Sequence, residues 1–408
     1  MSWLSINVPK DVLAASIVLG LFADIKIINL LVVALKPSLA GSFMTIMYIV
    51  IAIVLFWIGF FVQKNYTKHW SRGQIFVLIV SVLWYVFSYF FLGAPSVSIP
   101  FFIVLMVASF LFPGIVQIDA KTLIFVMLAI PFWGIMYVDI LFFQEIMEFG
   151  YISMGLSYSL LVPVMANLTY LLFFYDKHQT LKKKIVIWLF SACNLYYLIM
   201  MMTYGSRGPS LCVISMILFY FIVKYKEGIG ILIYKKRMFL LCIGLFFASM
   251  FFESLLVYIS EFLKEYDISL NIIDKFIRKG DEGDMTNGRG QLLDMAWDGF
   301  LRSPLLGYGT SQFERNTGVI YPHNFLLQML YDGGIILFFL IFIPLGRAFV
   351  RKLRNVSRDE FIVLFMFFFF SVPGSFFSGD LWQAYRLWLL FGTVFSTNFI
   401  YYSKLNNI

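Results

Sequence analysis

Long runs of apolar residues, separated by short polar stretches, dominate this sequence. The runs are continuous rather than alternating, which is typical of membrane-spanning helices and not of the strands of a β-barrel. We therefore predict an all-α integral membrane protein with about twelve transmembrane helices, in which residues 1–408 form a single polytopic domain. The predicted spans are residues 12–35 (interrupted by Asp24 and Lys26), 41–62, 73–92, 97–113, 120–143, 152–175, 184–202, 209–223, 238–258, 324–346, 360–377 and 382–402.

The basic residues gather in every second connection between these spans. Because positively charged connections stay in the cytoplasm, this pattern assigns that face and both termini to the cytoplasm. The pattern accounts for 20 of the 31 lysines and arginines: Lys10, Lys64, Lys68, Arg72, Lys121, Lys177, Lys182, Lys183, Lys184, Lys224, Lys226, Lys235, Lys236, Arg237, Arg347, Arg351, Lys352, Arg354, Arg358 and Lys404.

The opposite face receives short connections and one long loop, residues 253–322, which we expect to be extracytoplasmic (periplasmic). Apolar residues recur at helical spacing from Leu255 to Ile277, which predicts amphipathic helices on the membrane surface. A further helix should begin near Asn287, a good N-cap, and end at Ser303-Pro304. Its carboxylates Asp294 and Asp298 should lie on the helix surface, and Gly307-Tyr308-Gly309 should form a tight turn.

The composition agrees with a membrane protein and narrows the chemistry. The chain is 61% hydrophobic and 13% charged, whereas soluble domains are roughly 45–50% apolar and about 25% charged. Its net charge of +8 follows the predicted topology, so we expect no nucleic-acid partner. Cys193, Cys212 and Cys242 all lie inside apolar runs, which indicates neither a structural disulfide nor a metal site. We expect no metal and no cofactor.

Two arginines on the predicted outer face are candidate anion ligands. Arg207 lies in Gly205-Ser206-Arg207-Gly208, where the glycines would let a ligand approach the backbone; an arginine snorkelling to the interface is the simpler alternative. Arg289 should lie in the first turn of the helix capped by Asn287. A cation there opposes the helix dipole by about 0.3–1 kcal/mol, and a bound anion would reverse that cost. The alternative is a solvated surface arginine.

His323 is the histidine on the same predicted face, since His69 and His178 are cytoplasmic. An imidazole titrates near neutral pH and could act as a general base or orient an acceptor hydroxyl; an interfacial histidine without a role is the alternative. Together the three residues suit a reaction in which two arginines stabilise a diphosphate leaving group and the histidine serves the incoming hydroxyl. Alternative bases are the carboxylates Glu145, Glu148, Asp332 and Asp380.

Several short sequence motifs resemble those of the O-antigen polymerase and O-antigen ligase superfamily of bacterial envelope enzymes. Each motif is short, but their order and their placement relative to the spans make the combination specific. Asp332 departs mildly from the glutamate found in many members. The motifs are Gly205-Ser206-Arg207-Gly208, Gly288-Arg289, Trp297, Arg302-Ser303-Pro304-Leu305-Leu306-Gly307-Tyr308-Gly309, His323-Asn324 and Asp332-Gly333-Gly334.

The resemblance implies a metal-independent glycosyltransferase of the membrane C class, working at the outer face of the plasma membrane. Its donor would be an undecaprenyl-diphosphate-linked oligosaccharide. Residues matching Arg207 and Arg289 would engage the diphosphate, His323 would assist the acceptor, and Ser206, Asn287 and Asn324 would contribute to substrate binding. Membrane lipid and a chain-length regulator protein are the partners that the family suggests.

The resemblance leaves the reaction partly open. A polymerase would add the glycan to a new lipid-linked repeat unit in O-antigen (lipopolysaccharide) or capsular polysaccharide biosynthesis, and a ligase would transfer it to lipid A–core. We favour a polymerase because Gly307-Tyr308-Gly309 and the single histidine motif at Pro322-His323-Asn324 resemble polymerases more closely. A lipid-glycan flippase should show two related halves, which this sequence lacks, and a scaffold would not need the arginine pair.

The predicted orientation has a direct test. Cysteine introduced by Glu282→Cys should react with a membrane-impermeant thiol reagent added to intact cells, and cysteine introduced by Lys183→Cys should react only after the cells are opened. Gel-shift labelling measures both. The reverse labelling pattern would overturn the orientation.

Overall fold

The computed structural model describes residues 70–93, 102–115, 117–128, 145–148, 151–152, 154–176, 180–226, 230–250, 257–262, 265, 289–376, 380–396 and 399–401. The predicted spans 12–35 and 41–62, Asn287 and most of the loop segment 253–288 lie outside these residues. Within that loop segment, residues 257–262 are helical, in the part predicted to form an amphipathic helix.

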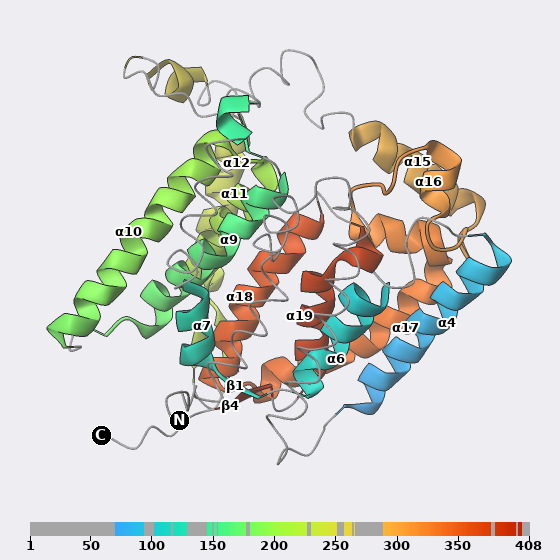
Figure 1. Cartoon of the computed structure of the whole chain (residues 1–408), viewed down its shortest axis with the longest axis horizontal. Coiled ribbons are helices and arrows are strands. Elements are labelled where there is room, and N and C mark those ends of the chain that lie inside the picture. Colours follow the sequence, from blue (N-terminus) through green and yellow to red (C-terminus); the bar gives the residue numbers. More distant parts are fainter. Residues whose placement is uncertain are drawn as a thin grey trace, which may run out of the picture.

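The described residues are mostly helical, as predicted (Figure 1). Helices α4, α9 to α12, α17 and α18 each overlap one predicted span. The elements in chain order are α4 (Arg72–Phe91), η2 (Phe102–Ala108), α6 (Ser109–Leu111), η3 (Phe112–Gly114), β1 (Ile118–Asp119), α7 (Ala120–Leu128), α9 (Met154–Thr169), η4 (Tyr170–Phe174), α10 (Leu181–Tyr204), α11 (Arg207–Ile222), β2 (Val223–Lys226), β3 (Gly230–Ile233), α12 (Lys235–Met250), α15 (Arg289–Arg302), α16 (Gln312–Thr317), α17 (Phe325–Asn355), α18 (Arg358–Ser375), η5 (Leu381–Gln383), α19 (Tyr385–Phe395) and β4 (Ile400–Tyr401).

Two small sheets depart from the predicted all-helical architecture. β1 pairs in parallel with β4, and β2 pairs with β3 as an antiparallel hairpin in the register Val223 to Ile233. The hairpin forms where we expected a basic linker. Its first strand alternates half-buried Val223 and Tyr225 with exposed Lys224 and Lys226, which is the period of a strand with one covered face.

Two helix ends also differ from the predicted spans. α17 continues from the predicted end at residue 346 to Asn355, because the residues that follow are mostly good helix formers with a basic last turn. α19 covers only Tyr385–Phe395 of the predicted span 382–402. Four helical segments in the described residues are long and apolar enough to cross a membrane: Arg72–Phe91, Leu156–Phe174, Leu181–Tyr204 and Phe325–Asn355.

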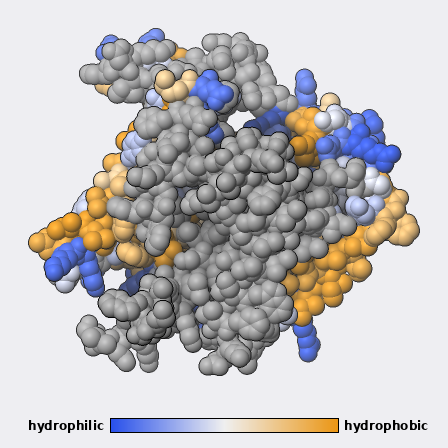
Figure 2. All heavy atoms as spheres, in the orientation of Figure 1, coloured by the Kyte–Doolittle hydropathy of each residue, from blue (hydrophilic) through white to orange (hydrophobic). Residues whose placement is uncertain are grey.

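The apolar surface lies on two flanks of the molecule. Figure 2 shows hydrophobic side chains along α10 on one flank and along α4 and α17 on the other. Exposed residues there include Leu83 and Phe90 on α4, Trp188 on α10 and Phe339 on α17. α18 is different, since buried residues run along its whole length from Asp359 to Gly374. It packs against α7, α9, α11 and α19, so it is the central helix of the described bundle (Figure 1).

One end of the bundle holds the basic residues of the described connections. There Trp70 Nε1, before α4, donates to the Leu111 carbonyl (3.2 Å), and Arg358 Nη2 donates to the carbonyl of Phe173 (2.9 Å). Connections that are far apart in the sequence therefore meet at this end. We call it the basic end; its described members include Arg72, Lys121, Lys224, Arg237, Lys352 and Arg358. Its orientation relative to a membrane stays a prediction.

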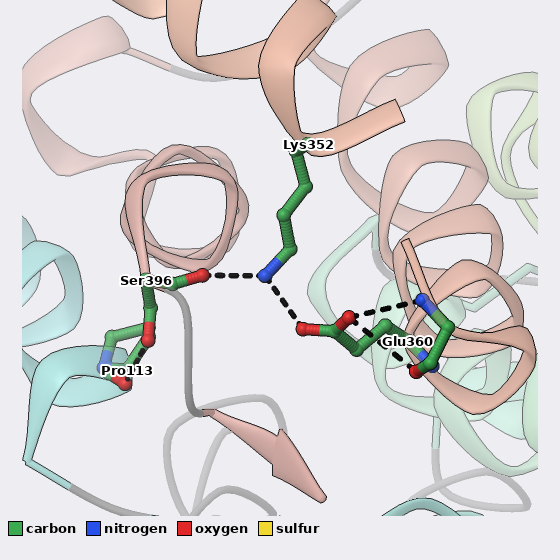
Figure 3. A network of polar contacts seen from close by, with 5 residues as sticks. Pro113, Lys352, Glu360 and Ser396 are labelled. Atoms are coloured by element: carbon green, nitrogen blue, oxygen red, sulfur yellow. Dashed lines mark hydrogen bonds and ion pairs between the residues drawn. The ribbon is translucent and has the colours of Figure 1, made fainter. Parts of the chain in front are cut away.

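Lys352 joins three elements at the basic end (Figure 3). Its ammonium forms an ion pair with Glu360 (2.7 Å) between side chains that are 10% and 12% exposed, and it also donates to the carbonyl of Ser396. Glu360 completes a capping box with Ser357 at the start of α18. Ser396 Oγ donates to the Pro113 carbonyl (2.7 Å). This lysine therefore fastens α17 to α18 and α19.

The opposite end of the bundle contains a break in α17. Gly334 has φ 59° and ψ −165°, which interrupts the helix. The segment between α15 and α16 fills the break. Tyr308 N donates to the Tyr331 carbonyl (2.9 Å) and Gly309 N to the Asp332 carbonyl (2.7 Å). From the other side, Ile335 N and Ile336 N donate to the carbonyls of Pro304 (2.8 Å) and Leu305 (3.3 Å).

The glycines of this contact are required by space as well as by conformation. A Cβ on Gly334 would lie 2.4 Å from the backbone of Leu305, and a Cβ on Gly307 would lie 2.5 Å from the Tyr331 carbonyl oxygen. Gly307 (φ 63°) and Gly309 (φ 98°) also have positive φ, as a tight turn would predict. The two segments, residues 302–309 and 332–334, thus form one structural unit, which we call the helix-break contact.

The helix-break contact gives a stability prediction with a control on the same helix. Gly334→Ala should destabilise the protein by about 3 kcal/mol or more, because its conformation is essentially restricted to glycine and its Cβ would overlap backbone atoms. Gly346→Ala, with no atom within 4 Å of the new Cβ, should be neutral or slightly stabilising. Thermal unfolding in detergent micelles compares the two, and equal midpoints would contradict the role of Gly334.

Candidate functional site

The turn between α10 and α11 packs directly on α9. Ser206 N donates to Ser157 Oγ (3.2 Å), and a Cβ on Gly208 would lie 2.4 Å from Tyr158 Oη. The glycines of this turn were expected to make room for a ligand; the space beside Gly208 is instead taken by Tyr158. The turn itself is held to the start of α9, where Ile152 N donates to the Tyr204 carbonyl (3.0 Å).

Arg207 is the first residue of α11, and Ser206 is its N-cap. The structure does not describe the Arg207 side chain. Ser206 makes no capping hydrogen bond to its own helix, and its Oγ is buried without a hydrogen-bond partner among the described residues. An uncapped helix N-terminus with a buried hydroxyl is suited to accept an anion.

Arg289 is the first described residue of α15, and its place in the first turn of that helix stays a prediction. Its guanidinium lies close enough to act electrostatically on both Tyr158 and His323. Asp294 and Asp298 are exposed on the same helix, as predicted. The Arg289 charge, on α15, therefore acts both on a residue of α9 and on the histidine that lies just before α17.

His323 occupies an unusual backbone conformation. Its φ of 59° is the left-handed region, which costs a non-glycine residue of order 1 kcal/mol or more and is often found at functional sites. Its ring lies edge-on to Tyr321 (4.5 Å between centroids), and Nδ1 is buried without a hydrogen-bond partner among the described residues. Burial, and then the Arg289 charge, lower the pKa of His323 below 6.5, which keeps the imidazole neutral at pH 7.

Asn324, which we predicted to bind substrate, has a structural role in the described residues. It is the N-cap of α17, and its Oδ1 accepts hydrogen bonds from Leu326 N and Leu327 N (both 3.1 Å). The capping bonds position His323 immediately before the helix. The substrate-binding role of Asn324 stays a prediction, and Asn287 lies outside the described residues.

Two of the four carboxylates considered as alternative bases, Asp332 and Asp380, are held by hydrogen bonds. Trp382 links them: its Nε1 donates to Asp332 Oδ2 (2.8 Å) and its backbone N to Asp380 Oδ1 (2.9 Å). Gln328 also donates to Asp380 Oδ1 (2.9 Å). Burial raises the pKa of Asp380 to about 6. These bonds fasten α17 to η5, while Glu145 and Glu148 lie on a separate short helix, residues 145–148.

Sequence reasoning missed two residues beside Arg289. Tyr158 contacts Gly208 in the turn before α11, and the Arg289 charge acts on it, as described above. The guanidinium carbon of Arg386 lies 5.4 Å from the centre of the Tyr158 ring. An arginine inside a predicted span, as Arg386 is, was a signal that sequence alone contained, since such residues are functional suspects by default. Nothing in the sequence connected Tyr158 to the other residues. In the described residues no three His, Cys, Asp or Glu side chains gather as metal ligands would.

Residues 192–342 match the protein family described as O-Antigen ligase. This range contains Arg207, Arg289, His323 and the helix-break contact, and the match confirms the resemblance to the O-antigen polymerase and ligase superfamily. The family includes both ligases and polymerases, which are glycosyltransferase-like enzymes acting on lipid-linked polysaccharides. No curated protein matches the chain.

The proximity of Arg289 to His323 can be measured by titration. In protein labelled with ¹³C-histidine, the His323 resonance should titrate with a midpoint below 6.5, and Arg289→Gln should raise that midpoint because one cause of the lowered pKa is removed. Arg315→Gln, on an exposed arginine that bonds to the Leu92 carbonyl, should leave it unchanged. His323→Gln assigns the resonance among the three histidines. If Arg289→Gln left the midpoint unchanged, the Arg289 charge would not act on His323.

Proposed function

With residues 192–342 matching the O-antigen ligase family, we propose that the chain is an O-antigen or capsular polysaccharide polymerase. It transfers an undecaprenyl-diphosphate-linked glycan onto a new lipid-linked repeat unit at the outer face of the bacterial plasma membrane. The observation that carries this proposal is the group formed by His323, Arg289 and the Tyr158 contact to the Arg207 turn.

The arginines serve the leaving group. Arg207 and Arg289 are the first described residues of α11 and α15, where a cation alone is unfavourable but a cation together with a bound anion is favourable. The glycosidic carbon–oxygen bond breaks with its electron pair passing to the diphosphate, and the guanidinium groups stabilise that charge. Ser206 Oγ, buried and not used as a cap, donates to the same phosphate oxygens.

The histidine serves the acceptor. As the acceptor hydroxyl oxygen forms its bond to the anomeric carbon, its proton passes to the neutral His323 imidazole. The lowered pKa of His323 keeps the base available at neutral pH, although it also makes the imidazole a weaker base. Asn324 fixes His323 by capping α17, so the imidazole is positioned by the first turn of that helix.

A ligase is the second candidate, because the matched family is described as O-Antigen ligase. Of the two motifs that favoured a polymerase, Gly307-Tyr308-Gly309 has a structural role in the helix-break contact. The Gly307-Tyr308-Gly309 motif therefore no longer favours either reaction. Both candidates use the same donor and the same arginines, and they differ only in the acceptor.

Single substitutions test the residues and separate the two reactions. Arg207→Ala, Arg289→Ala and His323→Ala should each insert into the membrane normally and lower transfer by about 10²-fold or more, as loss of a charge-stabilising group or general base does. A polymerase would then leave glycans with a single repeat, and a ligase would leave long lipid-linked chains not attached to core. Gel profiles of the glycans from complemented cells measure this.

Arg351→Ala is the matched control, since Arg351 is exposed on the last turns of α17 and should leave the glycan profile unchanged. Normal profiles in all three site variants would remove the site assignment. Normal profiles would leave the family assignment intact, because the match does not depend on these three side chains.

A further inference from the structure

Arg386 is surrounded by aromatic rings. Its guanidinium carbon lies 4.7 Å from the centre of the Phe370 ring, 5.3 Å from that of Tyr385 and 5.4 Å from that of Tyr158, and its Nε donates to Tyr385 Oη (3.2 Å). Its backbone is also fixed, because Ser371 Oγ donates to the Arg386 carbonyl (3.1 Å). Flat guanidinium groups stack well on aromatic faces while their N–H edges stay directed outward. The rings therefore hold the guanidinium group in place.

Arg386 also lies in the first turn of its helix, α19. Arg207 and Arg289 are the first described residues of α11 and α15. A positive charge in a first turn stands where the helix dipole is already positive. Arg289 and Arg386 both act on Tyr158, and an anion bound beside them would offset this dipole penalty.

Tyr158 gives an independent sign of a ligand. Its hydroxyl oxygen is buried and has no hydrogen-bond partner among the described residues, although leaving a buried hydroxyl unsatisfied is unfavourable. Arg386 and Arg289 both act on it electrostatically. Gly208 and Gly374 leave room for it: a Cβ on either would lie 2.4 Å and 3.0 Å, respectively, from Tyr158 Oη. The hydroxyl thus packs against Gly208 and Gly374, where both arginines act on it electrostatically.

We propose that Arg386 and Tyr158 bind the lipid diphosphate together with Arg289. Arg386 supplies a third cation, and the Tyr158 hydroxyl donates a hydrogen bond to a phosphate oxygen. This inference rests on the proposed function for its ligand, but both residues lie outside the matched range 192–342. A third cation suits a diphosphate, which carries more charge than a monophosphate and gains more as the glycosyl bond breaks.

Direct binding tests the two residues. Purified full-length protein in nanodiscs is titrated with undecaprenyl diphosphate and, separately, with undecaprenyl monophosphate. Arg386→Gln should weaken diphosphate binding roughly 10- to 100-fold and Tyr158→Phe roughly 5- to 50-fold, as expected for lost hydrogen bonds to a charged group. Both should reduce the preference for diphosphate over monophosphate. Arg351→Gln, at the basic end, should bind like the wild type.

Arg386→Gln could weaken binding by destabilising the protein, which a lowered thermal unfolding midpoint would reveal. In that case Tyr158→Phe decides whether the site binds the diphosphate, because it keeps the ring under Arg386 and removes only the hydroxyl. Wild-type affinity and preference in both variants, with binding lost in Arg289→Gln, would overturn this inference and leave the proposed function standing. Failure of the wild-type protein to bind the diphosphate would overturn the proposed function itself, and this inference with it.

Discussion

The break in α17 imposes the constraint on which the described structure depends. Backbone groups freed inside a membrane protein must be satisfied within the protein, because hydrocarbon offers no hydrogen bonds. Here the carbonyls of Tyr331 and Asp332 and the amides of Ile335 and Ile336 are satisfied by the segment between α15 and α16. That segment is therefore fixed to the helix, and with it the end of α15.

The fixed segment explains how a long loop can take part in a well-defined site. α15 begins with Arg289 and packs against α17, while His323 directly precedes the capped start of α17. The two residues thus share one supporting helix. The other side of the site comes from different parts of the chain: the turn before α11, Tyr158 on α9 and Arg386 on α19. A site built in this way takes one group from each of several helix ends.

Sequence predicted the elements of this arrangement better than their contacts. Continuous apolar runs located α4, α9, α10, α11 and α17. The hairpin β2–β3 was missed because its strand period covers only four residues within a basic stretch. The pairing of residues 302–309 with 332–334 was missed because the two segments looked like independent sequence motifs. They are joined by backbone hydrogen bonds, which leave no signal in the side-chain pattern.

The candidate site divides in the same way. Arg207, Arg289 and His323 were found because charged or titratable residues are rare on the predicted outer face. Tyr158 gave no signal, since a tyrosine among the many aromatic residues of this chain is ordinary, and its significance depends on the glycines and arginines that surround it in space. The Gly205–Gly208 turn was assigned to ligand access, but its small residues serve close packing against α9.

The burial of most of α18 has a consequence for how the protein responds to its bilayer. Phe370, which supports Arg386, belongs to this helix, and α19 packs beside it. Hydrophobic mismatch acts on helices that face lipid, and large apolar side chains are exposed on α4, α10, α11, α12 and the outer surface of α17. Thinning or thickening of the membrane therefore reaches the buried Phe370 ring beside Arg386 through the packing of these helices, which separates this arginine from changes in lipid composition.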